Sequence, residues 1–225
     1  MPELIKKICE DLKVHSQMLA QSSEDQWSQE PSVIDDSVRT ILIRCSELIR
    51  ATSDLGLTEN PTALGILSRQ LLEAFISLQW VISDEKRAVL YSEFSINELD
   101  RLSQLAMKDG LLSVKLRQDN SDITQEFLAN RGKPKKSVSI EQQAREAGIF
   151  HVYQVFYRFM SLDMHGKSET IMDRDERREA TVVHLHSIGA ISRASGHVAI
   201  LWLMHRKRAD NEKLRELLGL NESRA

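Results

Sequence analysis

One stretch of the sequence gathers side chains that can bind a phosphate and move a proton. It reads Tyr153-x3-Tyr157-Arg158-x2-Ser161-x3-His165-Gly166. On a helix, Arg158, Ser161 and His165 occupy positions i, i+3 and i+7, so they share one side, and Tyr157 extends it. An arginine binds phosphate through two parallel hydrogen bonds, and a histidine exchanges its proton near neutral pH. The spacing therefore predicts a candidate catalytic site of Arg158, His165 and Ser161.

The same stretch also has a structural interpretation. A histidine directly before a glycine is a common helix C-terminus, where the backbone carbonyls favour a positive charge. The preceding aromatic residues are typical of a core-facing surface, and they are Phe150, Tyr153, Phe156, Tyr157 and Phe159. The residue types alone leave both interpretations open.

A second pair of charged residues lies on a strongly apolar helix. Arg69 and Glu73 are four residues apart within SRQLLEAFISLQW, so they share a face. Apolar residues cover most of that helix, so at least one of the two charges is expected in the interior, where it needs a partner. The pair is either a structural ion pair or a support that reaches the helix carrying Arg158 and His165.

The combination of R-x3-E on an apolar helix with Y-x3-Y-R…S…H-G on a later helix resembles a widespread, poorly characterised bacterial helical family that is similar to the HEPN superfamily. The resemblance covers roughly Ile41 to Met204. HEPN domains are helical bundles that usually dimerise, and many are metal-independent endoribonucleases of toxin–antitoxin, anti-phage and RNA-processing systems. Their signature is an arginine followed, after four to six residues, by a histidine; six residues separate Arg158 from His165.

The resemblance implies a role for each site residue. Arg158 would bind the scissile phosphate, and His165 would take the proton of a ribose 2′-hydroxyl or protonate the leaving 5′-oxygen. Active members commonly carry a polar residue directly after the arginine; Phe159 stands there, and Ser161 or Asp163 is the polar side chain nearby. No metal or other cofactor is implied. The alternative is a non-catalytic dimeric helical module that binds RNA or a partner protein, such as an antitoxin.

The charge distribution and one basic turn bear on an RNA partner. The formal net charge is -3, but residues 1–110 hold 11 basic and 18 acidic side chains, whereas residues 111–225 hold 19 and 15. The candidate site therefore lies in the more basic part of the chain. The basic turn at 131–136 offers phosphate contacts through Arg131, Lys133, Lys135 and Lys136. Its alternative is a solvated loop.

Helical periodicity dominates the chain. The apolar spacing predicts helices near residues 4–19, 33–55, 60–83, 84–109, 122–130, 139–148, 150–165 and 175–208. Thr58 and Ser139 are predicted caps, with Pro61 in the first turn of its helix. No window shows sustained strand alternation. The sequence thus predicts an all-α protein: one bundle of about six to eight helices, with an up-and-down core and an irregular insertion near 111–140.

The chain is interpreted as one helical domain over residues 1–225, because the parts flanking the basic turn each lack a full core. Its expected parts are an N-terminal helix and loop at 1–31, a first helical half at 32–110, an insertion region at 111–148, the candidate-site helix and long final helix at 149–208, and a tail at 209–225.

The compartment follows from cysteine use and hydropathy. Cys9 and Cys45 have no partner at metal-ligand spacing, which indicates a reducing environment. The N-terminus has no signal-peptide pattern. The longest apolar run, Val198–Met204, has seven residues and is far shorter than a membrane span of about 20. A cytoplasmic protein without a membrane span is predicted, and that run is either central core or a dimer seam.

Overall fold

The structure is a computed structural model, and it describes residues 2–24, 32–131, 138–157 and 173–205. These residues are helical almost throughout. The helices are α1 (Pro2–Glu24), α2 (Val33–Gly56), α3 (Pro61–Val81), α4 (Glu85–Lys108), α5 (Thr124–Asn130), α6 (Ile140–Glu146), α7 (Phe150–Val152), the π-helix η1 (Tyr153–Tyr157) and α9 (Arg174–His205). Within the described residues, strand-like pairing is limited to an isolated antiparallel bridge between Lys115 and Asp122. The predicted all-α class is confirmed.

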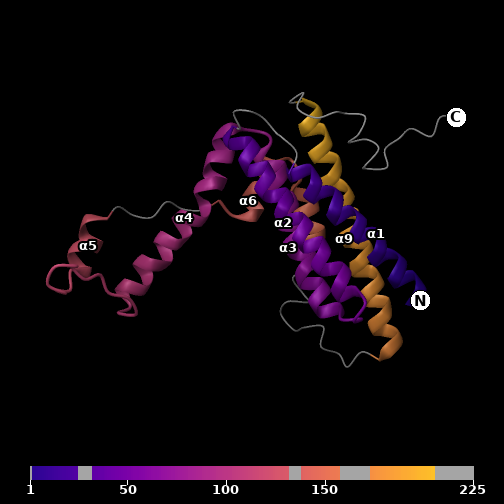
Figure 1. Cartoon of the computed structure of the whole chain (residues 1–225), viewed down its shortest axis with the longest axis horizontal. Coiled ribbons are helices and arrows are strands. Elements are labelled where there is room, and N and C mark those ends of the chain that lie inside the picture. The colour runs from indigo at the N-terminus through magenta and orange to yellow at the C-terminus, as the bar shows by residue number, and fades with distance from the viewer. Residues whose placement is uncertain (1, 25–31, 132–137, 158–172, 206–225) are drawn as a thin grey trace.

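Four long helices form the body of the molecule. α1, α2, α3 and α9 lie side by side (Figure 1), and their facing sides carry the buried core. In the segment 198–203 of α9, the side chains are buried apart from Leu201, which is 65% exposed. The core alternative is therefore the right one for this segment. Within the described residues, no helix is long and apolar enough to cross a membrane.

Small residues let these helices approach closely. The hydroxyl of Ser16 on α1 donates to the backbone oxygen of Ser46 on α2, and that of Ser46 donates to the backbone oxygen of Ser16, each at 2.9 Å. Gly56 ends α2 so near to α1 that a Cβ atom on it would lie 2.6 Å from the Sγ of Cys9. Real Cβ atoms essentially never lie that close to another atom, so a larger residue at this position would force Cys9 to shift.

Side-chain caps fix where the helices begin and end, and they correct two predictions. The cap of α3 is Asn60, whose side chain accepts from the backbone N–H of Ala63, and not Thr58. Ser139 caps α6 as predicted. α1 runs on to Glu24, past the predicted end near residue 19, and the hydroxyls of Ser22 and Ser23 in this last part donate to backbone oxygens of the preceding turn. The single-domain organisation stays a prediction.

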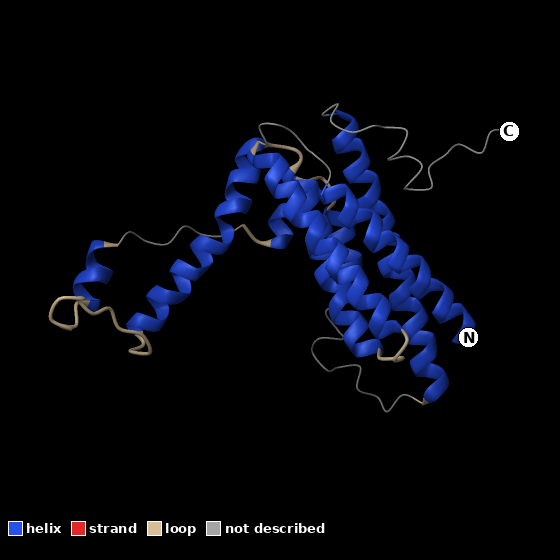
Figure 2. Cartoon of the chain, in the orientation of Figure 1, coloured by secondary structure: helices blue, strands red, loops and turns tan. Residues whose placement is uncertain are grey.

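One helix leaves the bundle. α4 packs against α2 and α3 at its start and then extends away from them as an arm, with α5 beside its far half (Figures 1 and 2). The root of the arm is fastened by the hydroxyl of Ser37 on α2, which donates to the backbone oxygen of Ala88 at 3.3 Å. Of the irregular insertion predicted near 111–140, residues 111–131 lie at the far end of this arm, where Figure 2 shows loops around α5, whereas residues 138–140 lie beside the bundle at the start of α6.

Candidate functional site

Three polar side chains join α3 to η1. The Nε of Arg69 donates to Oε1 of Glu73 at 3.2 Å, and the Nη2 of Arg69 donates to the hydroxyl of Tyr157. The guanidinium carbon also lies 4.4 Å from the centre of the Tyr157 ring, a distance at which a cation is attracted to the ring face. Arg69 and Glu73 are each only 18% exposed. We call these three residues the α3–η1 cluster.

The local sequence explains how the cluster forms. Arg69 and Glu73 are one turn apart on α3, beside the fully buried Leu72, so their side chains leave the apolar core on a common edge. On the other side, the rings of Tyr153 and Tyr157 stack at 4.6 Å between centres. Short π-helical segments occur frequently at functional sites, and η1 ends directly before Arg158.

Burial sets the protonation state of the phenol. Burial raises the pKa of Tyr157, and the negative charge of Glu73 raises it further, while the Arg69 guanidinium opposes both. Tyr157 therefore stays a neutral phenol at neutral pH. A neutral phenol accepts the hydrogen bond of Arg69 and keeps its own proton available as a donor.

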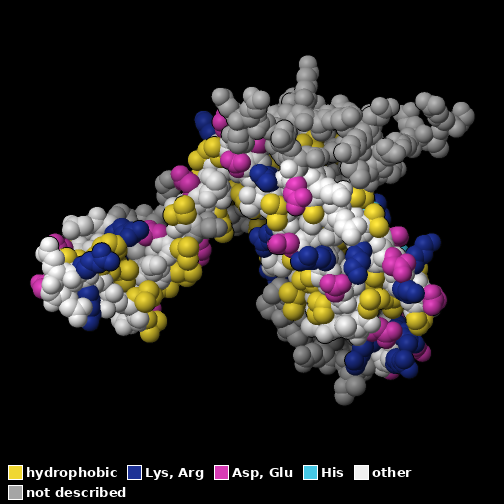
Figure 3. Space-filling view, in the orientation of Figure 1, with side chains coloured by type: hydrophobic (Ala, Val, Ile, Leu, Met, Phe, Trp, Pro, Cys, Tyr) yellow, Lys and Arg dark blue, Asp and Glu magenta, His cyan; other side chains and the backbone are white. Residues whose placement is uncertain are grey.

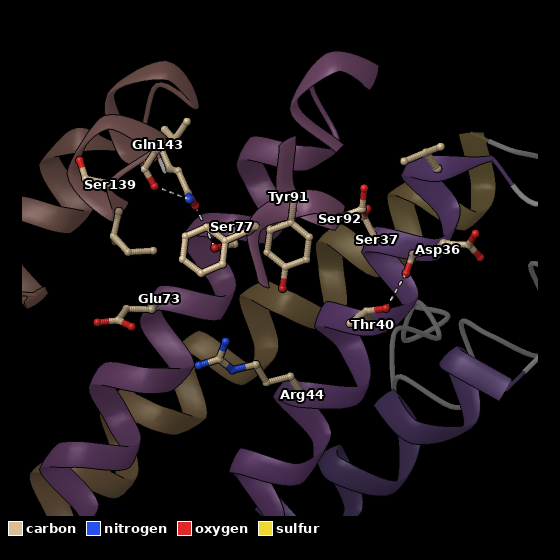
Figure 4. Close-up of a pocket in the computed structure, with 14 residues that line it drawn as sticks. Asp36, Ser37, Thr40, Arg44, Glu73, Ser77, Tyr91, Ser92, Ser139 and Gln143 are labelled. Atoms are coloured by element: carbon tan, nitrogen blue, oxygen red, sulfur yellow. Dashed lines mark hydrogen bonds between the residues drawn. The ribbon is translucent and has the colours of Figure 1, made fainter. Parts of the chain in front are cut away.

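A cavity of about 770 Å³ adjoins the cluster. It lies between α2, α3, α4 and α6, and Glu73 belongs both to its wall and to the α3–η1 cluster (Figure 4). The lining residues are Val33, Asp36, Ser37, Thr40, Arg44, Glu73, Ser77, Tyr91, Ser92, Phe94, Val138, Ser139, Ile140 and Gln143. We call this space the arm-root cavity, because α4 supplies one wall where it leaves the bundle.

The cavity presents donors, acceptors and aromatic surface together. Arg44 enters from α2, and the hydroxyl of Tyr91 points toward it, whereas the Glu73 carboxylate on α3 points away from both (Figure 4). Burial raises the pKa of Tyr91, against the opposing charge of Arg44. On the far wall, Ser77 donates to Oε1 of Gln143 at 2.9 Å. The volume falls in the range of small-molecule sites, and the lining suits a planar polar group.

The structure brings together the three residues predicted to support the site. Arg69 and Glu73 reach Tyr157, which lies 88 residues from Arg69 along the chain. The predicted catalytic residues Arg158, Ser161 and His165 lie outside the described residues. Their roles, and the supporting role of the cluster, stay predictions.

The basic turn is described only at its start. Arg131 makes an ion pair with Asp100 of α4 at 2.7 Å, and its guanidinium lies 5.0 Å from the centre of the Phe127 ring. Its charge is therefore already balanced, although the side chain is 46% exposed. Lys133, Lys135 and Lys136 lie outside the described residues, and phosphate binding by the turn stays a prediction.

Sequence reasoning missed the arm-root cavity. Its polar residues come from four helices, and no spacing along the chain relates Arg44 to Tyr91 or Gln143. The one available signal was that Tyr91 and Phe94 are the aromatic residues of a helix whose other apolar residues are aliphatic. In the described part of the chain, no three or more His, Cys, Asp or Glu side chains lie close enough together to bind a metal ion.

The described residues define the class of protein: it is an all-helical bundle with a projecting arm and a polar cluster between α3 and η1. Residues 35–179 match a family of unknown function, DUF5677. The match covers more than half of the chain and includes the cluster and every lining residue of the arm-root cavity except Val33, and the protein belongs to this family. No curated protein and no solved structure matches the chain. The activity must therefore be inferred from the site.

Proposed function

We propose that this protein is a HEPN-like, metal-independent endoribonuclease. Arg158 would bind the scissile phosphate, His165 would act as general acid and base, and Ser161 would be the polar companion. The observation that carries the proposal is the bridge from Arg69 and Glu73 to Tyr157. It fastens the residue directly before Arg158 to the core helix α3, which is what a site needs if its phosphate-binding arginine is to be held in place.

The reaction class follows from these residue types. The ribose 2′-oxygen attacks the adjacent phosphorus while His165 takes its proton, and the 5′-oxygen leaves with a proton from an acid. In a dimer, the histidine of a second copy is available as that acid. Arg158 stabilises the negative charge that develops on the phosphoryl oxygens. The products are a 2′,3′-cyclic phosphate and a 5′-hydroxyl.

The arm-root cavity supports an RNA substrate. Single-stranded RNA is recognised by splaying bases out onto aromatic side chains and hydrogen-bonding their edges. Tyr91 and Phe94 offer aromatic surface there, and Arg44 offers a guanidinium. Through Glu73, the cavity is continuous with the cluster that precedes Arg158.

The test is cleavage of a 5′-labelled single-stranded RNA by the purified full-length protein in the presence of a chelator. We expect cleavage with cyclic-phosphate ends, and we expect His165→Ala and Arg158→Ala each to abolish it. The matched control is His186→Ala, because His186 is an exposed histidine on α9. Cleavage that persists in His165→Ala, or its absence in the wild type, would overturn the proposal.

A second variant tests the supporting cluster. Tyr157→Phe keeps the ring and removes the hydroxyl that accepts from Arg69. If the cluster positions Arg158, kcat falls about tenfold while KM and the melting temperature change little. Tyr153→Phe, which keeps the stacked ring, is the control and should cleave normally. Equal loss in both variants would refute a specific role for the Tyr157 hydroxyl.

The second candidate function is a non-catalytic dimeric module that binds RNA or a partner protein. The exposed aliphatic side chains of α4, among them Leu99 at 65%, favour it because they offer a surface for association. A wild-type protein that binds the labelled RNA in an anisotropy titration without cleaving it would support the module and exclude the enzyme.

A further inference from the structure

Arg44 brings to the arm-root cavity a positive charge that no carboxylate of the described residues balances. Its Nη2 donates to the side-chain oxygen of Gln70 at 2.8 Å, and Gln70 is a neutral amide. The ion pairs of the described residues do not include Arg44. A guanidinium has several N–H donors in one plane, so those that Gln70 does not bind are available to a ligand in the cavity.

Gln70 also explains why Glu73, in the same cavity wall, does not neutralise Arg44. Oε1 of Glu73 accepts from Arg69 at 3.2 Å, and Oε2 accepts from the Nε2 of Gln70 at 3.4 Å. Figure 4 shows this carboxylate pointing away from Arg44. Gln70 thus lies between the two charges and binds both. Arg44 is held in place while its charge stays free for an anion.

A second donor lies beside the guanidinium. The hydroxyl of Tyr91 points toward Arg44 (Figure 4), and burial raises the pKa of Tyr91, so the phenol keeps its proton at neutral pH. An oxyanion near both groups would accept hydrogen bonds from both. Acidic and basic side chains are interspersed over the visible face of the bundle (Figure 3), so the general field there does not favour anions. Anion binding therefore depends on these local donors.

The hydroxyl groups of the cavity wall can only accept hydrogen bonds from a ligand. A serine or threonine hydroxyl has one proton and two lone pairs. Each of these hydroxyls already donates its proton to a protein oxygen, at 2.8 to 3.3 Å, and they belong to Ser37, Thr40, Ser77 and Ser92. Asp36 adds a further acceptor to the wall, about 12 Å from Arg44 along α2. The cavity is thus suited to a ligand with an acidic group at Arg44 and N–H or O–H donors elsewhere.

We propose that the arm-root cavity binds a nucleoside phosphate, with its phosphate at Arg44 and Tyr91. The amino and hydroxyl groups of the base and sugar would donate to the wall oxygens, and the base would pack on the ring of Phe94, which is 41% exposed. A simple aromatic acid would leave the wall oxygens without donors. A volume of about 770 Å³ is within the range of small-molecule sites. The nucleotide is either free or part of a single-stranded RNA, and the proposal stands without ribonuclease activity.

The first test is calorimetric titration of the full-length protein with each of the common ribonucleoside 5′-monophosphates. For those that bind, Arg44→Gln should raise the dissociation constant by about tenfold or more, the effect of losing a hydrogen bond to a charged group. The matched control is Arg50→Gln, which removes the same charge from an exposed position of α2 outside the cavity and should change little. Unchanged binding in Arg44→Gln, or a nucleoside that binds as tightly as its phosphate, would overturn the proposal.

A second variant tests the free charge of Arg44 without removing it. Gln70→Glu replaces the neutral amide that binds Arg44 with a carboxylate, so Arg44 gains an ion-pair partner. We expect nucleotide binding to weaken by about tenfold, as in Arg44→Gln. Circular dichroism checks that each variant is folded. Binding as tight as in the wild type would contradict the argument.

A single-stranded oligoribonucleotide, titrated into His165→Ala protein, distinguishes the two sources of the nucleotide. A free nucleotide is the ligand if the monophosphates bind and Arg44→Gln weakens them. A nucleotide of RNA is the ligand if only the oligonucleotide binds and Arg44→Gln, but not Arg50→Gln, weakens it. If neither binds, or if both variants lose binding equally, the proposal fails. Wild-type protein that binds in this way without cleaving RNA would refute the ribonuclease and leave the nucleotide site standing.

Discussion

Replacing Glu73 with alanine should lower stability by an amount set by burial. The change removes the ion pair with Arg69 and leaves a guanidinium that is 18% exposed with one of its partners gone. Exposed ion pairs contribute about 0–1 kcal/mol, whereas breaking a fully buried pair costs about 3–5 kcal/mol. Arg69 keeps its hydrogen bond to Tyr157. We therefore expect a loss of about 2 kcal/mol, which is about 4–8 °C in melting temperature for a chain of this size.

The measurement is urea unfolding followed by circular dichroism. The matched control is Glu141→Ala, because Glu141 also pairs with an arginine four residues away, at 2.7 Å, but with exposed side chains. It should cost less than about 1 kcal/mol. The double variant Arg69→Met with Glu73→Met should recover part of the loss, because no unpaired charge remains. An unchanged midpoint in Glu73→Ala, or an equal loss in the control, would refute the reasoning.

Two further predictions concern a buried histidine and a closely packed glycine elsewhere in the bundle. Burial lowers the pKa of His15 below its usual 6.5, so the unfolded chain takes up the proton first as the pH falls. The free energy of unfolding should therefore fall from pH 6.5 downward. His15→Gln should reduce this fall, measured by urea unfolding at pH 7.5 and 5.5. Gly56→Ala should lower the free energy of unfolding by about 1–3 kcal/mol, because the new Cβ would clash with Cys9 and press on Leu185. Gly189→Ala has room, with the nearest atom at 3.7 Å, and should be tolerated; a more stable Gly56→Ala would contradict the packing argument.

Most of the fold could be predicted because helices leave a periodic signal. Most expected and observed helices differ only at their ends, but the described part of the helix expected over 150–165 is the short α7 followed by the π-helix η1. Asn60 and Thr58 are both competent caps by residue type, and only the path of the chain decides between them. The departure of α4 from the bundle was not predictable, because leucines such as Leu99 and Leu102 look the same in a sequence whether they are buried in a core or exposed.

The candidate site was also predictable only in part. The pairing of Arg69 with Glu73 follows from a spacing of four on a helix, so the sequence was enough to predict it. Their contact with Tyr157 depends on how α3 and η1 pack, which local spacing does not determine. The arm-root cavity depends on four helices at once. Arg44 and Gln143 lie on helices far apart in the sequence and line one space only because the bundle folds.

The arm and the arm-root cavity share the first part of α4. Tyr91 and Phe94 form a wall of the cavity from the root of α4, and Ser37 fastens that root to α2 through Ala88. The position of this wall therefore depends on how the root of α4 is held against α2.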